Sequence, residues 1–188
     1  MKTLSIPEIA KIEFKNHILK ELSLTDKNSI FGMWQCYTPG TFYYSFDVSI
    51  TPNGYITIGG DIGDVIIRSN YKTVYSIVAW IRGSVNSPDY LLSKVQPVCQ
   101  EAMSEFSPQL AKEHLTDLMS SYECSREDIQ RVRDLWKWGK NDGSVDDWYD
   151  AYSRVFPGDD LPDCNKLTPS AEWAIECLRL FSKLFAEK

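Results

Sequence analysis

The sequence predicts an α+β fold in which a small antiparallel sheet, at about residues 31–69, is followed by a mainly helical C-terminal half. Three observations predict this class. Apolar and polar residues alternate in the first part, as in half-buried strands. Turn signals separate these runs, and a helical period replaces the alternation after Tyr71. Strands followed by helices are typical of α+β proteins, whereas an α/β protein would interleave them.

The N-terminal stretch predicts a helix over about residues 7–22. A capping hydroxyl at Ser5 is followed by Pro7 and by an acid at Glu8, which together are typical of a helix start. An apolar stripe then recurs at every fourth residue, at Phe14, Ile18 and Leu22. The alternation within residues 11–15 leaves a strand as the alternative.

The strands are predicted from period-two patterns. Residues 31–36 alternate, and residues 42–50 place aromatic and aliphatic side chains on one face of a half-buried strand. The turn at 52–54 contains Asn53 and Gly54, which tolerate positive φ. A returning strand follows with Ile56 and Ile58 on one face, and a third strand begins at Val65.

The helices of the second half are predicted from apolar periodicity and capping residues. The expected starts lie near residues 74, 87, 97, 125, 144 and 168. The helix beginning at 97 is expected to run to about residue 120, with a break near Pro108 because proline disrupts a helix interior. We expect residues 1–96 to form an α+β region and residues 97–188 a helical region, packed together as one globular unit.

Composition excludes several classes. A chain of 188 residues with 43% hydrophobic content can bury one sizeable core. Its apolar runs are too short to span a bilayer, and the N-terminus lacks the apolar core of a signal peptide, so we expect a cytoplasmic protein without membrane contact. The five cysteines form no CxxC pair, which indicates reduced thiols rather than disulfides or a zinc site.

The negative charge is concentrated in one segment. The net charge is −6, and residues 142–163 hold seven aspartates and one basic residue, Arg154. No basic patch for phosphate contacts is evident, so direct binding of nucleic acid is not expected. An acidic face suits a basic protein surface, and solubility is the other explanation. The expected partner-binding residues are Asp142, Asp146, Asp147, Trp148, Asp150, Asp159, Asp160 and Asp163.

Aromatic residues accompany this acidic segment. They are Trp136, Trp138, Trp148, Tyr149 and Tyr152. Exposed aromatic side chains rimmed by carboxylates make good anchors at protein interfaces. The alternative is that these rings only dock small helices onto the rest of the protein, and the sequence leaves both explanations open.

The glycine-rich corner at 59–64 (GGDIGD) is the sharpest local feature. Asp61 and Asp64 could hold a hard cation such as magnesium. The structural alternative, which we favour, is that the glycines permit a tight turn and the aspartates cap its amides. The only histidines are His17 and His114, both in predicted helices, and no nucleophile motif or phosphate loop is present. We therefore expect no catalytic residues, no resident metal and no cofactor.

The first half of the chain combines a tryptophan–cysteine pair, an aromatic strand, a turn, a glycine–aspartate corner and two later dipeptides. These positions are Trp34 and Cys36, 42–46, 52–54, 60–64, Asp89 and Tyr90, and Lys94 and Val95. In this pattern the chain resembles a family of uncharacterised small proteins carried by bacteriophages and prophages. The match covers about residues 6–96. It implies a phage context and a bacterial host cytoplasm, and it implies no activity.

These observations together lead to one functional hypothesis and two alternatives. The hypothesis is a phage or prophage accessory protein that binds a bacterial protein and inhibits a defence effector, as anti-CRISPR proteins do, with its acidic surface competing with nucleic acid. The first alternative is a metal-assisted phosphoester or nucleotide hydrolase that uses Asp61 and Asp64. The second is a small-molecule sequestering protein with a pocket beside Tyr43, Tyr44 and Tyr55. The sequence does not specify the oligomeric state.

Overall fold

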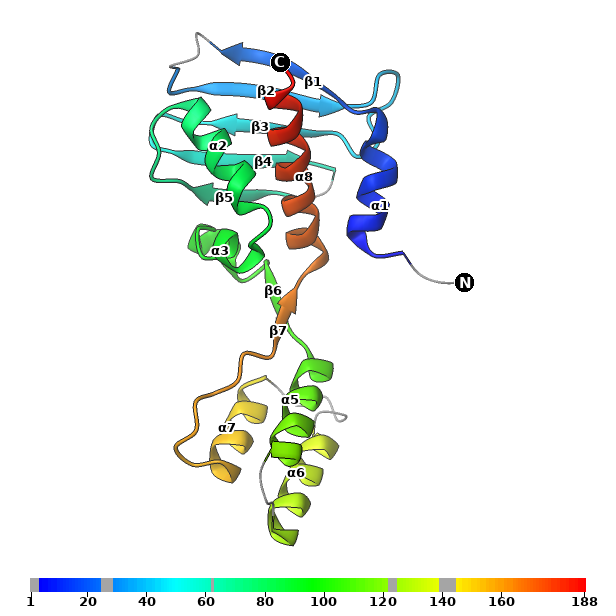
Figure 1. Cartoon of the computed structure of the whole chain (residues 1–188), viewed down its shortest axis with the longest axis vertical. Coiled ribbons are helices and arrows are strands. Elements are labelled where there is room, and N and C mark those ends of the chain that lie inside the picture. Colours follow the sequence, from blue (N-terminus) through cyan, green and yellow to red (C-terminus); the bar gives the residue numbers. More distant parts are fainter. Residues whose placement is uncertain (1–3, 25–28, 62, 122–124, 139–144) are drawn as a thin grey trace. The chain divides into compact units, whose positions relative to one another are not determined.

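The computed structural model describes residues 4–24, 29–61, 63–121, 125–138 and 145–188. The chain divides into two compact units (Figure 1). Unit 1 comprises Met1–Ser104 and Leu167–Lys188, and unit 2 comprises Glu105–Lys166. These bounds differ from the expected ranges 1–96 and 97–188, because the C-terminal segment of the chain belongs to the same unit as the sheet.

Unit 1 contains a five-stranded antiparallel sheet, so the predicted α+β class is confirmed. Its strands lie in chain order: β1 (Ile18–Leu24), β2 (Gly32–Tyr37), β3 (Phe46–Ile50), β4 (Tyr55–Gly60) and β5 (Val65–Arg68). Each strand follows its neighbour through a short connection, which is the simplest way to build an antiparallel sheet.

The alternating residues of these strands line one side of the sheet. Trp34 and Cys36 of β2, Val48 of β3, and Ile56 and Ile58 of β4 are all buried. The polar members of the same strands, such as Asp47, are exposed. The period-two pattern read from the sequence is confirmed in β2, β3 and β4, because the pleat points successive side chains to opposite faces.

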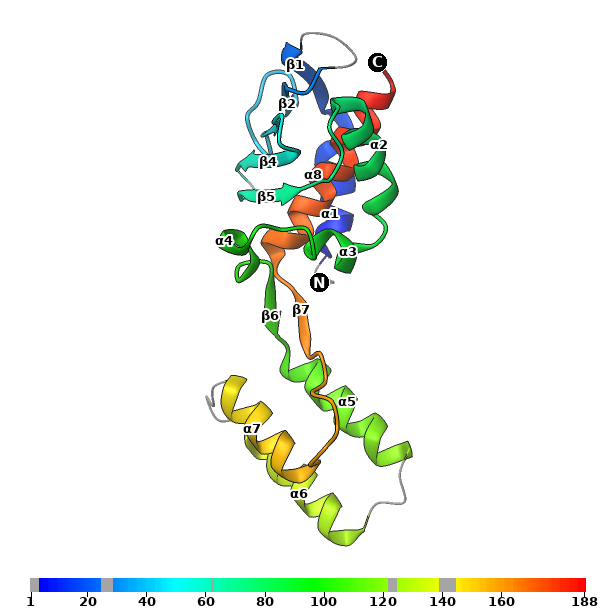
Figure 2. The same ribbon diagram turned by 90° about the vertical axis from the view of Figure 1, so that its left-hand side faces the viewer.

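Helices α1 (Ile6–Glu13), α2 (Val74–Ser84) and α8 (Pro169–Ala186) cover this buried side of the sheet (Figure 2). Unit 1 also contains the short helices α3 (Pro88–Leu92) and α4 (Pro97–Gln100). Helix α8 supplies Phe181 and Phe185, whose ring centroids lie 5.2 and 5.5 Å from that of Trp34. The core of unit 1 therefore joins strands from the first half of the chain to its last helix.

The expected helix over residues 7–22 is wrong beyond Glu13. A 3₁₀ turn (Phe14–Asn16) follows α1, and the remainder forms β1. Strand β1 pairs with β2 from Ile18 opposite Tyr37 to Leu24 opposite Gly32. The ladder with β2 outweighs the local helical pattern, because it provides partners for the backbone and places Leu19 in the core.

The expected aromatic strand over residues 42–50 is shorter than predicted. Strand β3 begins at Phe46, and residues 42–45 form a turn in which the Ser45 N–H donates to the Phe42 carbonyl at 3.1 Å. Tyr44 has a φ of +57°, which is unusual for a bulky residue. Phe42 and Tyr43 therefore leave the sheet, with exposed fractions of 77% and 80%.

Unit 2 is a group of three helices, α5 (Pro108–Ser121), α6 (Arg126–Trp138) and α7 (Val145–Val155). The helices predicted to follow Ser125 and to cover about 145–155 are confirmed. The helix expected over about residues 97–120 is divided into α4, the short strand β6 (Ser104–Phe106) and α5. The expected break near Pro108 is confirmed, because α5 begins there, whereas the strand between the two helices was not predicted. The core of unit 2 is made of Ala111, Leu115, Val132, Leu135, Trp148, Tyr152 and Cys164.

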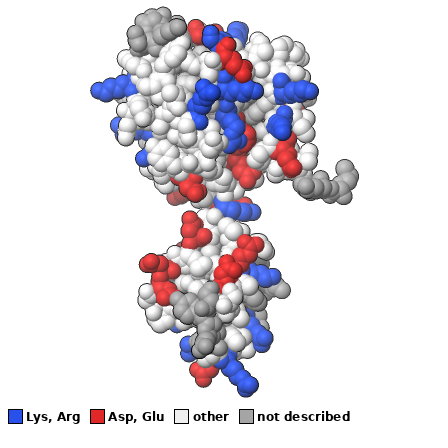
Figure 3. All heavy atoms as spheres, in the orientation of Figure 1, with Lys and Arg blue, Asp and Glu red and all other residues white. Residues whose placement is uncertain are grey.

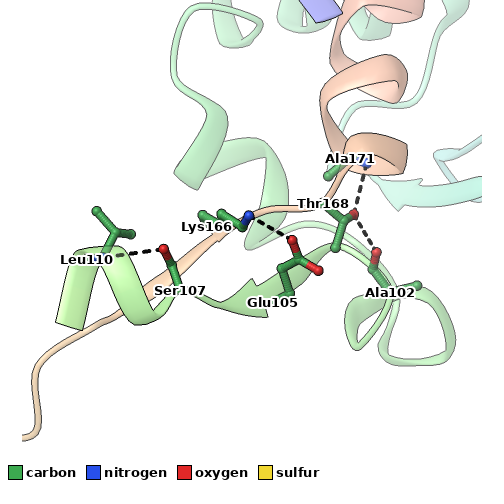
Figure 4. A network of polar contacts seen from close by, with 7 residues as sticks. All are labelled: Ala102, Glu105, Ser107, Leu110, Lys166, Thr168 and Ala171. Atoms are coloured by element: carbon green, nitrogen blue, oxygen red, sulfur yellow. Dashed lines mark hydrogen bonds and ion pairs between the residues drawn. The ribbon is translucent and has the colours of Figure 1, made fainter. Parts of the chain in front are cut away.

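The chain passes from unit 1 to unit 2 through β6 and returns through β7 (Asn165–Leu167), and these two strands pair with each other. Figure 4 shows the polar contacts along this passage. Lys166 Nζ lies 3.0 Å from Glu105 Oε1. The Thr168 hydroxyl donates to the Ala102 carbonyl at 2.7 Å and accepts from the Ala171 N–H at 3.2 Å, so it caps helix α8.

Candidate functional site

Helix α7 separates its acidic residues from its aromatic residues. Asp146, Asp147 and Asp150 are exposed, whereas Trp148 and Tyr152 are buried. Trp148 and Tyr152 are four residues apart, so they lie on the same face of the helix. Asp146 and Asp147 also occupy the first turn, where negative charge is favoured by the helix dipole. The carboxylates of α7 therefore lie on its exposed face, opposite the face that carries the buried aromatic residues.

The chain that follows α7 adds further carboxylates. Asp159, Asp160 and Asp163 are exposed, and Gly158 has a φ of +94°, which turns the backbone after Pro157. Asp163 has a local structural role, because one of its carboxylate oxygens accepts from the backbone and side-chain nitrogens of Asn165, each at 3.0 Å. Asp142, the remaining expected residue, lies outside the described residues.

Within the described ranges, four of these aspartates have no neutralising cation of the protein beside them. In the described part of the chain, no ion pair with Lys or Arg is formed by Asp146, Asp150, Asp159 or Asp160. Acidic atoms are visible on the surface of unit 2 in Figure 3. We define the acidic surface as Asp146, Asp147, Asp150, Asp159, Asp160 and Asp163.

Trp148 requires a correction, because it is not exposed as an interface anchor would be. Only 4% of the residue is exposed, and its ring stacks on Tyr152 at a centroid distance of 5.4 Å. Phe106 packs on the same ring at 5.5 Å, and His114 Nε2 lies 3.2 Å from the Tyr152 hydroxyl oxygen. The docking explanation holds for this residue: its ring fixes α7 to the rest of unit 2.

Tyr149 also packs within unit 2. It is half-buried against Phe106 and Trp148, with centroid distances of 6.1 and 5.2 Å. Burial raises the pKa of its phenol, and the neighbouring Cys164 and Asp163 add to this effect. The ring therefore remains neutral and contributes packing rather than charge beside the acidic surface.

The glycine corner has the geometry of a backbone turn. Gly60 and Gly63 have φ values of +150° and +109°, and the Gly63 N–H lies 3.3 Å from the Gly60 carbonyl oxygen. A Cβ on Gly60 would lie 2.5 Å from the Ser45 carbonyl oxygen. Asp61 donates its backbone N–H to that same oxygen at 3.2 Å, and its side chain is exposed, as is that of Asp64. These contacts show why glycine is needed at the corner. The chain segments of β3 and β4 approach so closely that a Cβ on Gly60 would meet backbone atoms.

Among the described residues, no group of three or more His, Cys, Asp or Glu side chains is placed to hold a metal ion. At the corner, Asp61 and Asp64 are exposed carboxylates, and they are the pair named from the sequence. Within the described ranges, no third His, Cys, Asp or Glu joins this pair.

His17 has a structural environment. Its Nε2 lies 3.0 Å from the Tyr44 carbonyl oxygen, and its Nδ1 lies 3.0 Å from the Thr38 hydroxyl oxygen. A carbonyl oxygen only accepts, so Nε2 donates, and in the neutral ring Nδ1 accepts from Thr38. Phe14 packs on the imidazole at 4.9 Å, and 6% of His17 is exposed. The residue holds the unusual backbone of Tyr44 in place.

The three tyrosines expected to line an aromatic pocket each have different surroundings. Tyr44 stacks on Trp173 at 5.3 Å, whereas Tyr43 is exposed and Tyr55 lies under the guanidinium of Arg68 at 5.4 Å. A cavity of about 410 Å³ lies elsewhere in unit 1, and it is lined by residues of α2 and α8 and of the segments that follow them. The sequence reasoning missed this cavity, because its two walls are about a hundred residues apart in the chain.

Two further findings bear on the class of protein. Within the described ranges, no helix is both long enough and apolar enough to cross a membrane. Comparisons with protein-family models, with curated proteins and with solved structures found no match to this chain.

Proposed function

We propose that this chain is a phage or prophage accessory protein that acts by binding a bacterial protein through the acidic surface of unit 2. The proposal depends on one observation: exposed carboxylates of unit 2 form no ion pair with a Lys or Arg side chain that the structure describes. Asp146, Asp150, Asp159 and Asp160 are exposed and form no ion pair within the described part of the chain. Uncompensated charge of one sign steers association with a surface of the opposite sign.

The chemistry of this surface indicates the class of partner. A partner with a basic groove would gain Coulomb energy from several carboxylates at once, as it does from the phosphates of a nucleic acid. Bacterial defence effectors that hold a guide and a target nucleic acid have such positively charged channels. We infer that the acidic surface occupies a channel of this kind and thereby excludes the nucleic acid.

The packing of unit 2 supports this role, since it holds the carboxylates in place before binding. Trp148 and Tyr152 fix α7 from the inside, and Asp163 is bonded to Asn165. A surface that is already ordered loses less conformational entropy when the partner binds. The aromatic residues therefore contribute to binding by positioning the charges rather than by touching the partner.

The proposal is tested by competition with nucleic acid. A purified, guide-loaded CRISPR effector is mixed with fluorescently labelled target DNA, and displacement of the DNA by the full-length protein is followed by anisotropy. The test variant carries Asp146→Asn, Asp150→Asn, Asp159→Asn and Asp160→Asn. We expect it to need about tenfold or more protein for half displacement, since each exposed charge contributes up to about 1 kcal/mol. The salt dependence should also weaken.

A matched variant controls for net charge. It carries Asp47→Asn, Asp61→Asn, Asp64→Asn and Asp89→Asn, which are exposed residues of unit 1. This control should displace DNA as well as the unmodified protein does. Equal losses in both variants would refute the role of the acidic surface, and absence of displacement by the unmodified protein would refute the defence effector as the partner.

A further inference from the structure

The cavity of unit 1 is unusual for an acidic protein, because basic side chains line it. It has a volume of about 410 Å³ and lies where α2 and α8 meet, near their C-terminal ends. Arg82, Arg179 and Lys183 line it, against a single carboxylate from Glu187. Figure 3 shows Lys and Arg atoms gathered over this part of unit 1. The local charge is therefore opposite in sign to the net charge of −6.

One of these cations has a structural partner. Arg179 bonds to the carboxylate of Glu176, and its other terminal nitrogen donates to the Val85 carbonyl at 3.0 Å. Val85 is the C-cap residue of α2, so Arg179 satisfies one of the carbonyls at that helix end.

The other two cations have no such partner. Arg82 lies in the last turn of α2 and Lys183 in the last turn of α8, and both are exposed. Neither forms an ion pair with any residue that the structure describes. Position near a helix C-terminus favours a cation in each helix separately. That preference alone does not explain why the two helices bring their cations to the walls of one cavity.

The remaining lining residues add hydrogen-bonding and apolar surface. Asn86 provides amide groups, Ser182 is buried beneath the cavity, and Val85 and Ala186 provide apolar area. A volume of about 410 Å³ is within the range of about 300–1,000 Å³ typical of small-molecule sites. Planar guanidinium groups match the oxygens of a phosphate, and a lysine provides a further point charge.

We infer that this cavity binds a small molecule that carries a phosphate or diphosphate group, with Arg82 and Lys183 as its main contacts. The residues of this cavity belong to unit 1, whereas those of the acidic surface belong to unit 2. A nucleoside diphosphate would place its phosphates between the two cations and its uncharged part against Val85 and Ala186. Inorganic pyrophosphate would use the cationic part alone.

Calorimetric titration of the full-length protein at low ionic strength tests this inference. The probes are inorganic pyrophosphate, ADP and uncharged adenosine. We expect pyrophosphate and ADP to bind with a Kd below about 1 mM, and adenosine not to bind. Arg82→Gln and Lys183→Gln should each raise the Kd about tenfold or more, because each variant loses a charge-assisted hydrogen bond to the phosphate. Tighter binding of ADP than of pyrophosphate would identify the nucleoside as part of the ligand.

Two further variants make the result unambiguous. Lys11→Gln removes an exposed charge from α1 and should leave the Kd within about twofold. Arg82→Lys keeps the charge and should retain part of the affinity. Each variant is first checked for an unchanged thermal transition, since a purely structural role of these cations would alter stability and not affinity. Absence of pyrophosphate binding, or an equal loss in Lys11→Gln, would overturn the inference.

Discussion

At the scale of single residues, burial decides the chemistry of the cysteines. Cys36 and Cys177 are almost completely buried in the core of unit 1. Burial raises the pKa of both thiols well above the ordinary value of 9.0, with a smaller contribution from nearby negative charge. Both residues therefore act as small apolar side chains in the folded protein.

This burial leads to a labelling prediction. Iodoacetamide at pH 8.5 should leave Cys36 and Cys177 unmodified in the native protein, because only an accessible thiolate reacts. Peptide mass spectrometry measures the modification at each site, and the half-buried Cys99 serves as the internal comparison. All of these sites should react in denaturant. The free energy of unfolding should also fall as the pH rises above about 9, because only the unfolded chain then ionises these thiols.

Rapid native labelling of Cys36 or Cys177 would contradict the packing described for α8 against the sheet. Cys177 lies on α8 and Cys36 on β2, and the two thiols lie close enough for the charge of one to affect the other. Access to either thiol would require α8 to separate from the sheet.

At the scale of elements, close backbone approach explains the glycines at the ends of strands. Gly54 donates its N–H to the Thr51 carbonyl at 3.0 Å and has a φ of +78°. A Cβ at this position would lie 2.4 Å from the Ser69 carbonyl oxygen. Gly60 is similarly confined by Ser45 and Phe46. The turn chemistry predicted from the sequence is thus confirmed at Gly54, where positive φ is required.

A pair of glycine substitutions tests this explanation. Gly60→Ala should lower the free energy of unfolding by about 1–3 kcal/mol, because its φ of +150° is strained for alanine and the Cβ would meet backbone atoms. Gly83→Ala should raise it by about 0.5–1 kcal/mol, since this glycine lies in α2 with open space around it. Urea unfolding measures both, and a neutral Gly60→Ala would show that the corner tolerates a side chain.

At the scale of the whole molecule, each unit has its own hydrophobic core. Ile77 is fully buried in the core of unit 1, and Leu115 is fully buried in the core of unit 2. No member of one core belongs to the other in the described part of the chain. The two candidate sites are divided in the same way, with the acidic surface in unit 2 and the basic cavity in unit 1.

Core truncation tests whether the two cores are energetically separate. Ile77→Ala and Leu115→Ala should each lower stability by about 2–5 kcal/mol in the affected unit. Hydrogen exchange followed by mass spectrometry should show lost protection in unit 1 for the first variant and in unit 2 for the second. Thr116→Ala, an exposed change on α5, should alter neither. Loss of protection throughout the chain in either core variant would indicate one cooperative unit.

The sequence by itself determined the elements whose local signals agree with their environment. Strands β4 and β5 alternate with period two, α2 follows the apolar periodicity, and α3, α6, α7 and α8 begin at the start signals that were read from the chain. The acidic segment was also evident from composition, and its described aspartates are exposed. In these cases propensity, pattern and packing favour the same conformation, so local information is sufficient.

Only the tertiary structure decided the remaining features. Residues 18–24 join the sheet because β2 provides their backbone partners, and Trp148 is buried because α5 and α6 surround its helix face. Helix α8 packs on the sheet, and Arg82 and Lys183 line the same cavity. Both features depend on contacts between residues that are far apart in the chain. The physical reason is that pairing and burial energies depend on which segments meet in space, and a local pattern does not encode that choice.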